Sequence, residues 1–392
     1  MPSFTSSSER LTAADRPGVA QPVPVRDIPQ KPWRAIFAVS MILTLVLVGL
    51  WEWRMRSLEL LPGDLDDGAS AWAEQRRRID TEDVQVAIVG DSRILFDTDL
   101  NRFQALTGIR PVQLALPGTN GRPFLENLAE DPHFHGLAIV GIAETSYFRE
   151  GIGLQKDALA RYHYESPSQR VSFILHRALS RVFGFLDEDY RLSTLVQQLD
   201  PDWRPGAKGP YDEVWKISSS IDDRQTYLWP RIEEDERLRM HARAVWGLIF
   251  SAPPVTDAVI KMTLEKTRAA VAEIRAHGGD VVFVRPPSAP ELRVTEEKRL
   301  PRARGWDSLL KTAKVKGIHF DDFASMRGLV LPEFSHLRRT CSTVFTDAYV
   351  RVLAGITNRI HLRPGSPQPL VPKDCAQYAR LQRPQPGSLS IR

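Results

Sequence analysis

Residues 84–93, VQVAIVGDSR, decide how this 392-residue chain folds. The apolar, mostly β-branched run predicts a short strand buried on both faces of a parallel sheet. Gly90 permits a sharp turn at the end of the strand, and Ser92 follows two residues later. Open α/β sheets bind ligands at the carboxyl ends of their strands, so Ser92 is a candidate functional residue. The alternative is a loop serine that caps the following helix.

Four further apolar runs continue the sheet, at residues 110–116, 135–143, 280–284 and 318–320. Helical patterns over 99–106, 256–277, 305–313 and 336–356 alternate with them. This alternation predicts an α/β domain over residues 82–358, with five parallel strands and helices on both faces. Residues 150–254 interrupt the series and are interpreted as a helical insertion. The polar, Pro-rich segments 1–32 and 359–392 predict disordered tails.

A membrane-spanning helix is predicted over residues 35–53. Residues 35–51, AIFAVSMILTLVLVGLW, contain no charge and would rise about 26 Å as a helix, near the lower limit for a bilayer. Trp33, Trp51 and Trp53 flank the run as interfacial aromatics do. More basic residues precede it than closely follow it, which favours a single-pass inner-membrane protein with a cytoplasmic amino terminus and a periplasmic main domain. Residues 54–81 then form a juxtamembrane linker with a helix near 70–80.

The chain has only two cysteines, Cys341 and Cys375. In an exported domain they can form a disulfide, which would attach the carboxyl-terminal tail to the domain. Two unrelated free thiols are the simpler interpretation.

An activated serine needs a histidine within reach and a third group to orient the ring. Of the nine histidines, His336 is placed suitably, after the last strand and at the start of the last helix. Glu333 precedes it by three residues and can fold back to accept from its second ring nitrogen. The alternative is a helix amino terminus with a favourable acid and an incidental histidine.

Gly90-Asp91-Ser92 after the first strand and Glu-x-x-His before the last helix resemble the GDSL/SGNH hydrolase superfamily. The resemblance covers residues 82 to 356 without the insertion. It implies a three-layer flavodoxin-like fold, an acyl-serine intermediate at Ser92 and His336 as general base. It also implies oxyanion donors from the Ser92 amide and from Gly118.

The family's asparagine donor after the third strand is replaced by Ala143, and its usual aspartate by Glu333. A lost oxyanion donor costs about 3–4 kcal/mol of transition-state stabilisation. Asn120 is the candidate substitute, and Thr119 is another. Asp91, Arg93 and Arg285 are candidates for the rim of the site.

A membrane anchor followed by such a domain is similar to polysaccharide O-acyltransferases and their relatives. The resemblance implies a serine acyltransferase or esterase acting on ester-linked acyl groups, acetyl above all, of an envelope carbohydrate, with a multispanning membrane acyltransferase as a partner. A catalytically degenerate scaffold or glycan-binding protein is the alternative. No cofactor, metal or nucleic-acid partner is expected; the net charge is only +4, and the chain has no nucleotide-binding motif.

Three other features each have two interpretations. The insertion's tryptophans can stack on sugars or pack an irregular region. The basic amphipathic helix near 170–184 can lie on the membrane or pack on the domain. His133 and His135 can form a metal pair or belong to a surface loop. The tryptophans concerned are Trp203, Trp215, Trp229 and Trp246.

Overall fold

The computed structural model describes residues 31–150, 153–192 and 216–375. The chain divides into two units, Met1–Trp51 and Glu52–Arg392. The predicted disorder of residues 1–30 and 376–392 therefore lies outside the described residues, as do Trp203 and Trp215.

The first helix, α1, spans Trp33–Ser57, and its apolar side chains are exposed along the predicted span. It has a mean hydropathy of 2.2 over its most apolar window, none of which is buried inside the protein. Its 25 residues correspond to a rise of about 38 Å. The prediction of one amino-terminal helix long and apolar enough to cross a membrane is thus confirmed.

The main unit is built on a five-stranded, all-parallel sheet, as the sequence predicts. Its strands are β1 (Val86–Val89), β2 (Val112–Gln113), β3 (Leu137–Gly141), β6 (Asp280–Arg285) and β7 (Lys316–His319), in the spatial order β2-β1-β3-β6-β7. Ala87 pairs with Val112 on one side and with Ala138 on the other. β2 is shorter than predicted, although the Leu114 and Leu116 amides still donate to β1 and to Gly90 beyond it.

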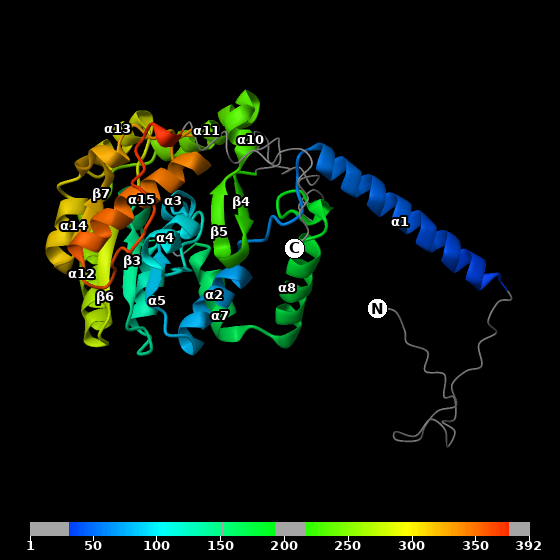
Figure 1. The fold of residues 1–392 in the computed structure, drawn as a ribbon, viewed down its shortest axis with the longest axis horizontal. Helices are drawn as coiled ribbons and strands as arrows, with labels where there is room; N and C mark the ends of the chain where they lie inside the picture. Colours follow the sequence, from blue (N-terminus) through cyan, green and yellow to red (C-terminus); the bar gives the residue numbers. More distant parts are fainter. Residues whose placement is uncertain (1–30, 151–152, 193–215, 376–392) are drawn as a thin grey trace, which may run out of the picture. The chain divides into compact units, whose positions relative to one another are not determined.

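Helices cover both faces of the sheet (Figure 1). Val86 and Ile88 of β1 enter the core beneath α3 (Ser92–Asp97), α4 (Leu100–Thr107) and α15 (Arg339–Ile356). Ala87 and Val89 enter the opposite core with α2 (Ala69–Thr81), α5 (Arg122–Ala129), α12 (Asp257–Ala276) and α14 (Trp306–Ala313). This alternation makes β1 apolar at every position, since both of its faces are buried. Two further helices of this unit are α6 (Glu144–Tyr147) and α13 (Pro290–Arg299).

The insertion is not purely helical, which corrects the prediction. It contains α7 (Gln155–Tyr164), α8 (Pro167–Ser180), α10 (Pro230–Glu234) and α11 (Glu236–Phe250), together with an antiparallel hairpin of β4 (Ser218–Ile221) and β5 (Gln225–Leu228). Three residues, Asp222 to Arg224, connect the hairpin strands, and two of them, Asp223 and Arg224, adopt positive φ. The buried Gln225 joins the hairpin to the junction of α3 and α4, since its side chain accepts from Leu100 N and donates to Thr98 O.

The carboxyl-terminal segment up to residue 375 is packed, so the prediction of disorder from residue 359 is wrong for this part. Ile360 is fully buried, and Cys341 and Cys375 form a disulfide rather than remaining free thiols. Arg102 donates to Gln368 O, and Arg351 donates to Pro367 O. A Pro-rich segment without regular structure is held here because side chains of the domain satisfy its carbonyls.

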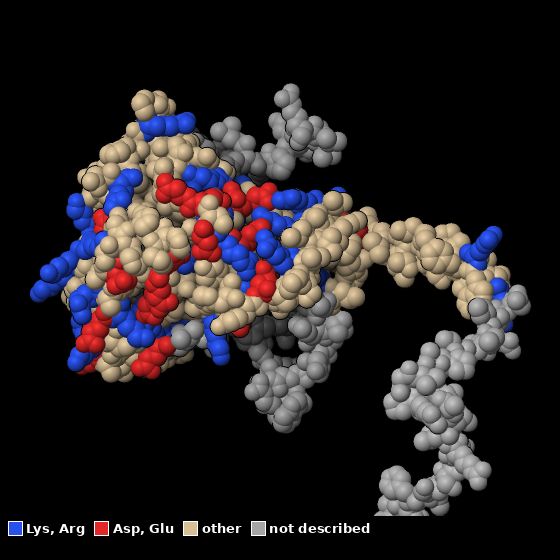
Figure 2. Space-filling model, turned by 90° about the horizontal axis from the view of Figure 1, so that it is seen from below, with Lys and Arg blue, Asp and Glu red and all other residues tan. Residues whose placement is uncertain are grey.

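Acidic and basic side chains are interspersed over the face of the main unit shown in Figure 2. This mixture agrees with the small net charge of +4. The surface gives no support for a nucleic-acid footprint on this face.

Candidate active site

Ser92 lies at the carboxyl end of β1, as the first residue of α3. Gly90 makes the turn with φ +154°, and a Cβ there would lie 2.5 Å from Ile94 Cγ2. The Asp91 carboxylate caps α3 by accepting from Arg93 N at 3.1 Å. Thus Asp91, not Ser92, performs the capping role considered for the serine, and the serine hydroxyl is left for another partner.

Three glycines allow the backbone behind Ser92 to pack closely. A Cβ on Gly121, after β2, would lie 2.6 Å from Gly90 Cα. A Cβ on Gly141, at the end of β3, would lie 2.3 Å from Ile94 Cβ. These contacts fix the turn after β1 against the neighbouring chain segments, so the position of Ser92 is set by close packing.

The structure brings the three predicted catalytic side chains together. His336 Nε2 lies 2.8 Å from Ser92 Oγ, and His336 Nδ1 lies 2.9 Å from Glu333 Oε1. Glu333 is fully buried and His336 is 2% exposed, whereas Ser92 is partly exposed. The serine hydroxyl is therefore the member of this triad most accessible to a substrate.

A turn before α15 holds the histidine, because the helix starts at Arg339, three residues later than the sequence predicts. Glu333 Oε1 accepts from the backbone amides of Ser335 at 3.2 Å and His336 at 2.5 Å. Leu337 N donates to Asp97 Oδ1 at 2.9 Å, which fixes the other side of the turn. Glu333 thus shapes the turn and orients the imidazole at the same time.

Two aromatic rings enclose His336. Phe96 of α3 lies 4.3 Å from it between ring centroids, and Trp246 of α11 lies 6.0 Å away. Trp246 Nε1 donates to Glu333 Oε2 at 2.6 Å. Sequence reasoning did not assign either ring to the site, because both contacts depend on how distant elements pack. For Trp246 it considered only sugar stacking or packing.

The predicted side-chain oxyanion donors are engaged elsewhere. Asn120 Nδ2 donates to Arg149 O at 2.9 Å, its Oδ1 accepts from Arg122 N, and the residue is fully buried. Thr119 Oγ1 donates to Leu116 O at 2.6 Å. Both side chains therefore stabilise the turn after β2, which corrects their candidate roles. No hydrogen bond joins the backbone N–H of Ser92 or Gly118 to another described residue.

The rim candidates are buried, with exposures of 7% for Asp91, 5% for Arg93 and 1% for Arg285. Arg93 donates to Ser335 Oγ at 3.0 Å and pairs with Glu296 at 2.5 Å. Arg285, at the end of β6, pairs with Glu296 at 2.5 Å and with Glu144 at 3.1 Å. Arg93 and Arg285 therefore belong to a buried ionic cluster with Glu296 and Glu144, whereas Asp91 caps α3, so none of the three lines an exposed rim.

Burial and neighbouring charges shift two pKa values in and beside this cluster. Burial raises the pKa of Glu296, but Arg285 and Arg93 outweigh it and bring this pKa down to about 2. Burial lowers the pKa of His319, and the neighbouring arginines lower it further, to about 2. His319 therefore stays neutral at physiological pH, so it adds no positive charge beside Arg285.

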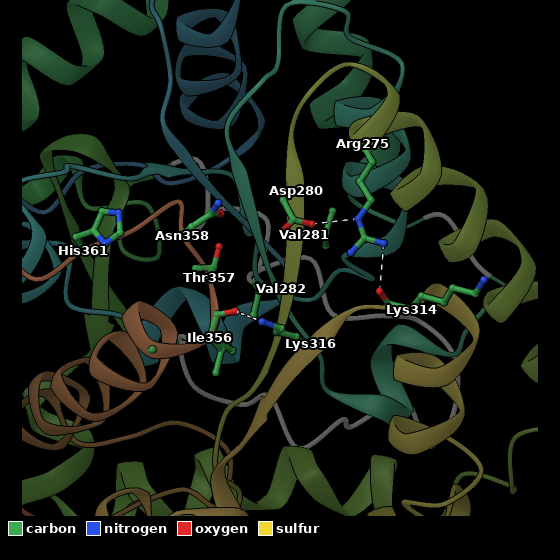
Figure 3. A pocket seen from close by; sticks show the side chains of 11 residues that line it. Arg275, Asp280, Val281, Val282, Lys314, Lys316, Ile356, Thr357, Asn358 and His361 are labelled. Carbon is green, nitrogen blue, oxygen red and sulfur yellow. Dashed lines mark hydrogen bonds and ion pairs between the residues drawn. The ribbon is translucent and has the colours of Figure 1, made fainter.

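The cavity in Figure 3 has a volume of about 640 Å³. It lies at the amino ends of β6 and β7, whereas Ser92 follows the carboxyl end of β1. Asp280 and Lys316, the first residues of β6 and β7, lie beside it with Arg275. Arg275 is paired with Asp280 at 3.1 Å, and Lys316 donates to Ile356 O. Arg275, Asp280 and Lys316 thus already have partners, and the cavity is remote from Ser92.

The remaining candidates have structural roles. His133 Nδ1 contacts Asp131, and His135 Nδ1 contacts His277 O. Within the described ranges no group of three metal-ligating side chains is present. Trp229 is 4% exposed, so it packs within the insertion and offers no face for a sugar.

No family model and no curated protein matches this sequence.

Proposed function

We propose that this chain is a membrane-anchored serine acyltransferase or esterase of the SGNH type. It acts on ester-linked acyl groups, acetyl above all, of an envelope or exported polysaccharide. The observation that carries the proposal is the continuous hydrogen-bond chain from Ser92 through His336 to Glu333. An activated serine, a base and an orienting acid are the three parts that nucleophilic acyl transfer requires.

In the proposed reaction, His336 Nε2 takes the Ser92 hydroxyl proton as Oγ attacks the acyl carbonyl carbon. The backbone N–H groups of Ser92 and Gly118 donate to the oxyanion. Collapse of the tetrahedral intermediate breaks the bond to the leaving oxygen, which takes the proton from His336. A sugar hydroxyl or water then attacks the acyl-serine with His336 again as base, which releases the product and restores the serine.

The topology supports the SGNH assignment. Counted within the main sheet, the strand order is 2-1-3-4-5, which is the flavodoxin-like order of doubly wound folds. Ser92 follows β1 at the point where the order reverses, between β1 and β3, and ligands bind there in such sheets. Ala143 departs from the family pattern, so the proposed oxyanion hole relies on backbone donors.

The membrane setting supports an exported substrate. The apolar helix α1 is proposed as a single-pass anchor, with its amino terminus in the cytoplasm and the main unit in the periplasm. The disulfide between Cys341 and Cys375 suits such an oxidising compartment. Esterified envelope glycans are made or trimmed there, and a multispanning membrane acyltransferase is the proposed source of the acyl group in the transferase case.

The first test uses a fluorophosphonate probe on the full-length protein in detergent. We expect covalent labelling of the wild type and none of Ser92→Ala. Ser308→Ala, on α14, is the matched control and should label normally. Equal labelling of Ser92→Ala, or no labelling of a folded wild type, would overturn the enzyme proposal. The second outcome would favour a degenerate scaffold, for which the departure at Ala143 is the supporting observation.

The second test measures acyl esters on the envelope polysaccharide of cells carrying Ser92→Ala in place of the wild type. A fall in ester content supports the transferase, and a rise supports the esterase. Unchanged ester content, with normal levels of the variant protein, would contradict a polysaccharide substrate.

A further inference from the structure

Helix α8 presents an apolar face that no described part of the protein covers. Val171 is 54% exposed, Ile174 54%, Leu175 58% and Leu179 48%. Residues at this spacing lie on one side of a helix. Ser180 points the other way and is 2% exposed, so the opposite side is the one that packs on the protein. This disagrees with the simpler expectation that the apolar side packs on the domain.

The helix is well formed in spite of this exposure. Ser166 and Gln169 make a reciprocal capping box at its start, and Pro167 follows the cap. Such a cap fixes the first turn independently of the apolar face. A stable helix with a contiguous exposed apolar stripe is typical of a surface that contacts another apolar phase.

The carboxyl-terminal end of α8 is attached to the residues that directly follow the apolar stretch of α1. Arg56 donates to Val182 O at 3.2 Å, and Glu52 accepts from the amides of Gly184 at 3.0 Å and Phe185 at 3.1 Å. Gly63 N also donates to Ser180 O at 2.8 Å. These bonds hold the end of α8 beside the juxtamembrane chain.

These contacts lie at a defined place along α1. Glu52 and Arg56 follow Trp51, the last residue of the uncharged run, by about 1.5 Å and 7.5 Å of helix rise. The headgroup region on each side of a bilayer is about 5–8 Å deep. When residues 35–51 span the hydrocarbon core, Glu52 and Arg56 follow in the chain at headgroup depth, and the residues directly after α8 bond to these two side chains.

Arginines lie on one side of the apolar face. Arg177 and Arg181 pair with Asp222 at 3.2 Å and 2.7 Å, and Arg170 is exposed one turn from the start of the helix. Basic residues beside an apolar stripe are the pattern of helices that lie in the interface of anionic membranes. In such helices the guanidinium groups reach the headgroups while the apolar side chains enter the acyl boundary.

We propose that α8 lies in the interface of the same bilayer that α1 spans, with Val171, Ile174, Leu175 and Leu179 inserted at the acyl boundary. The proposal rests on the membrane anchoring described under the proposed function, but not on the chemistry at Ser92. It gives the main unit a membrane contact of its own in addition to the anchor. The occupant of the apolar face is therefore lipid, not a second copy of the chain or another protein.

The test places single nitroxide labels in the full-length protein, reconstituted in vesicles of phosphatidylethanolamine and phosphatidylglycerol. The variants are Leu175→Cys on the apolar face, Lys266→Cys at an exposed position of α12 as control, and Leu45→Cys within α1. The native cysteines are paired and do not react without reductant. For each label, the rate at which the nitroxide collides with oxygen, which is apolar and enters the bilayer, is compared with its collision rate with a water-soluble nickel chelate.

At position 175 we expect the oxygen-to-nickel collision ratio to shift toward the value at position 45. At position 266 it should stay at the value of water-exposed sites. A water-like ratio at 175 with a bilayer value at 45 would overturn the α8 proposal and leave the anchor standing. A water-like ratio at 45 would refute the anchor, and the α8 proposal with it. Spin–spin broadening at 175 that disappears on dilution with unlabelled protein would identify a second copy as the occupant and also overturn the proposal.

Discussion

Glu333 shows how single residues determine the site. Its carboxylate is fully buried and accepts from two backbone amides, from His336 Nδ1 and from Trp246 Nε1. A buried carboxylate requires such partners, because burial without them is costly. The charge-assisted bonds fix both its oxygens, so the ring of His336 has a defined orientation toward Ser92.

We predict that Trp246→Phe lowers kcat while KM stays near the wild-type value. The change keeps the ring and removes one hydrogen bond to Glu333, which is worth about 1.5–3 kcal/mol, or roughly tenfold to hundredfold in rate. Steady-state hydrolysis of an activated acetyl ester measures this. Trp53→Phe, at an exposed position of α1, is the control and should retain full activity. Wild-type kcat in Trp246→Phe would show that the bond does not act on the triad.

Asp97 provides a pH-dependent prediction. Burial raises its pKa well above the usual value, although the bond from Leu337 N and the charge of Arg93 oppose this. Deprotonation is thus easier in the unfolded chain, so Asp97 destabilises the fold increasingly as the pH rises above the unfolded-state pKa near 3.8. Asp97→Asn keeps the acceptor for Leu337 and removes the charge.

We expect the stability of Asp97→Asn relative to the wild type to increase between pH 4 and pH 8, in urea unfolding at the two pH values. Asp97→Ala should be about 1–3 kcal/mol less stable than Asp97→Asn at both pH values, because Leu337 N loses its partner in the alanine variant only. A difference between wild type and Asp97→Asn that does not change with pH would contradict the assignment of a raised pKa.

At the scale of elements, the site depends on how closely β1, β3 and the turn after β2 approach one another. Gly121 has ordinary helical φ and ψ, so its need for glycine is purely steric. Its hypothetical Cβ would meet the backbone of Gly90, which cannot move without moving Ser92. Packing of elements and placement of the nucleophile are therefore coupled here.

We predict that Gly121→Ala destabilises the protein by about 1–3 kcal/mol, the usual cost of overpacking, and lowers fluorophosphonate labelling of Ser92. Gly355→Ala is the control, because a Cβ at that position in α15 meets nothing within 4 Å. It should be neutral or stabilising by about 0.5–1 kcal/mol, since alanine favours helix. Equal stability of the two variants in urea unfolding would contradict the packing argument.

At the scale of the whole molecule, the disulfide joins α15 to the end of the described chain. It closes a loop of 34 residues between Cys341 and Cys375. In the chain-entropy account a loop of this length contributes about 3–4 kcal/mol, since the link restricts the unfolded chain. The packed segment 357–375 adds Ile360 to the core beneath α15.

We expect Cys375→Ser to unfold at a lower urea concentration than the wild type and to be cleaved by protease within residues 357–375. Treating the wild type with reductant should reproduce both effects, and reductant should not change the variant further. A variant as stable and as protease-resistant as the wild type would show that the side-chain contacts alone hold the segment.

The sequence determined the parts of this protein that depend on local pattern. The apolar run of β1 predicted a buried strand, the alternation of strands and helices predicted the parallel sheet, and the uncharged run predicted a long apolar helix. The spacing of Glu333 and His336 placed an acid within reach of a histidine. Each of these depends on neighbours in the chain, for which periodicity and turn chemistry suffice.

Tertiary structure decided the rest, because contacts between distant residues leave no local signal. It placed His336 against Ser92, used Asn120 and Thr119 to hold a turn, and buried Arg285 among carboxylates. It also brought Trp246 to Glu333 across 87 residues and left the apolar side of α8 exposed. A polar side chain is available to a functional site only when no nearer group satisfies its hydrogen bonds. Which groups lie near it is determined only when the chain is packed.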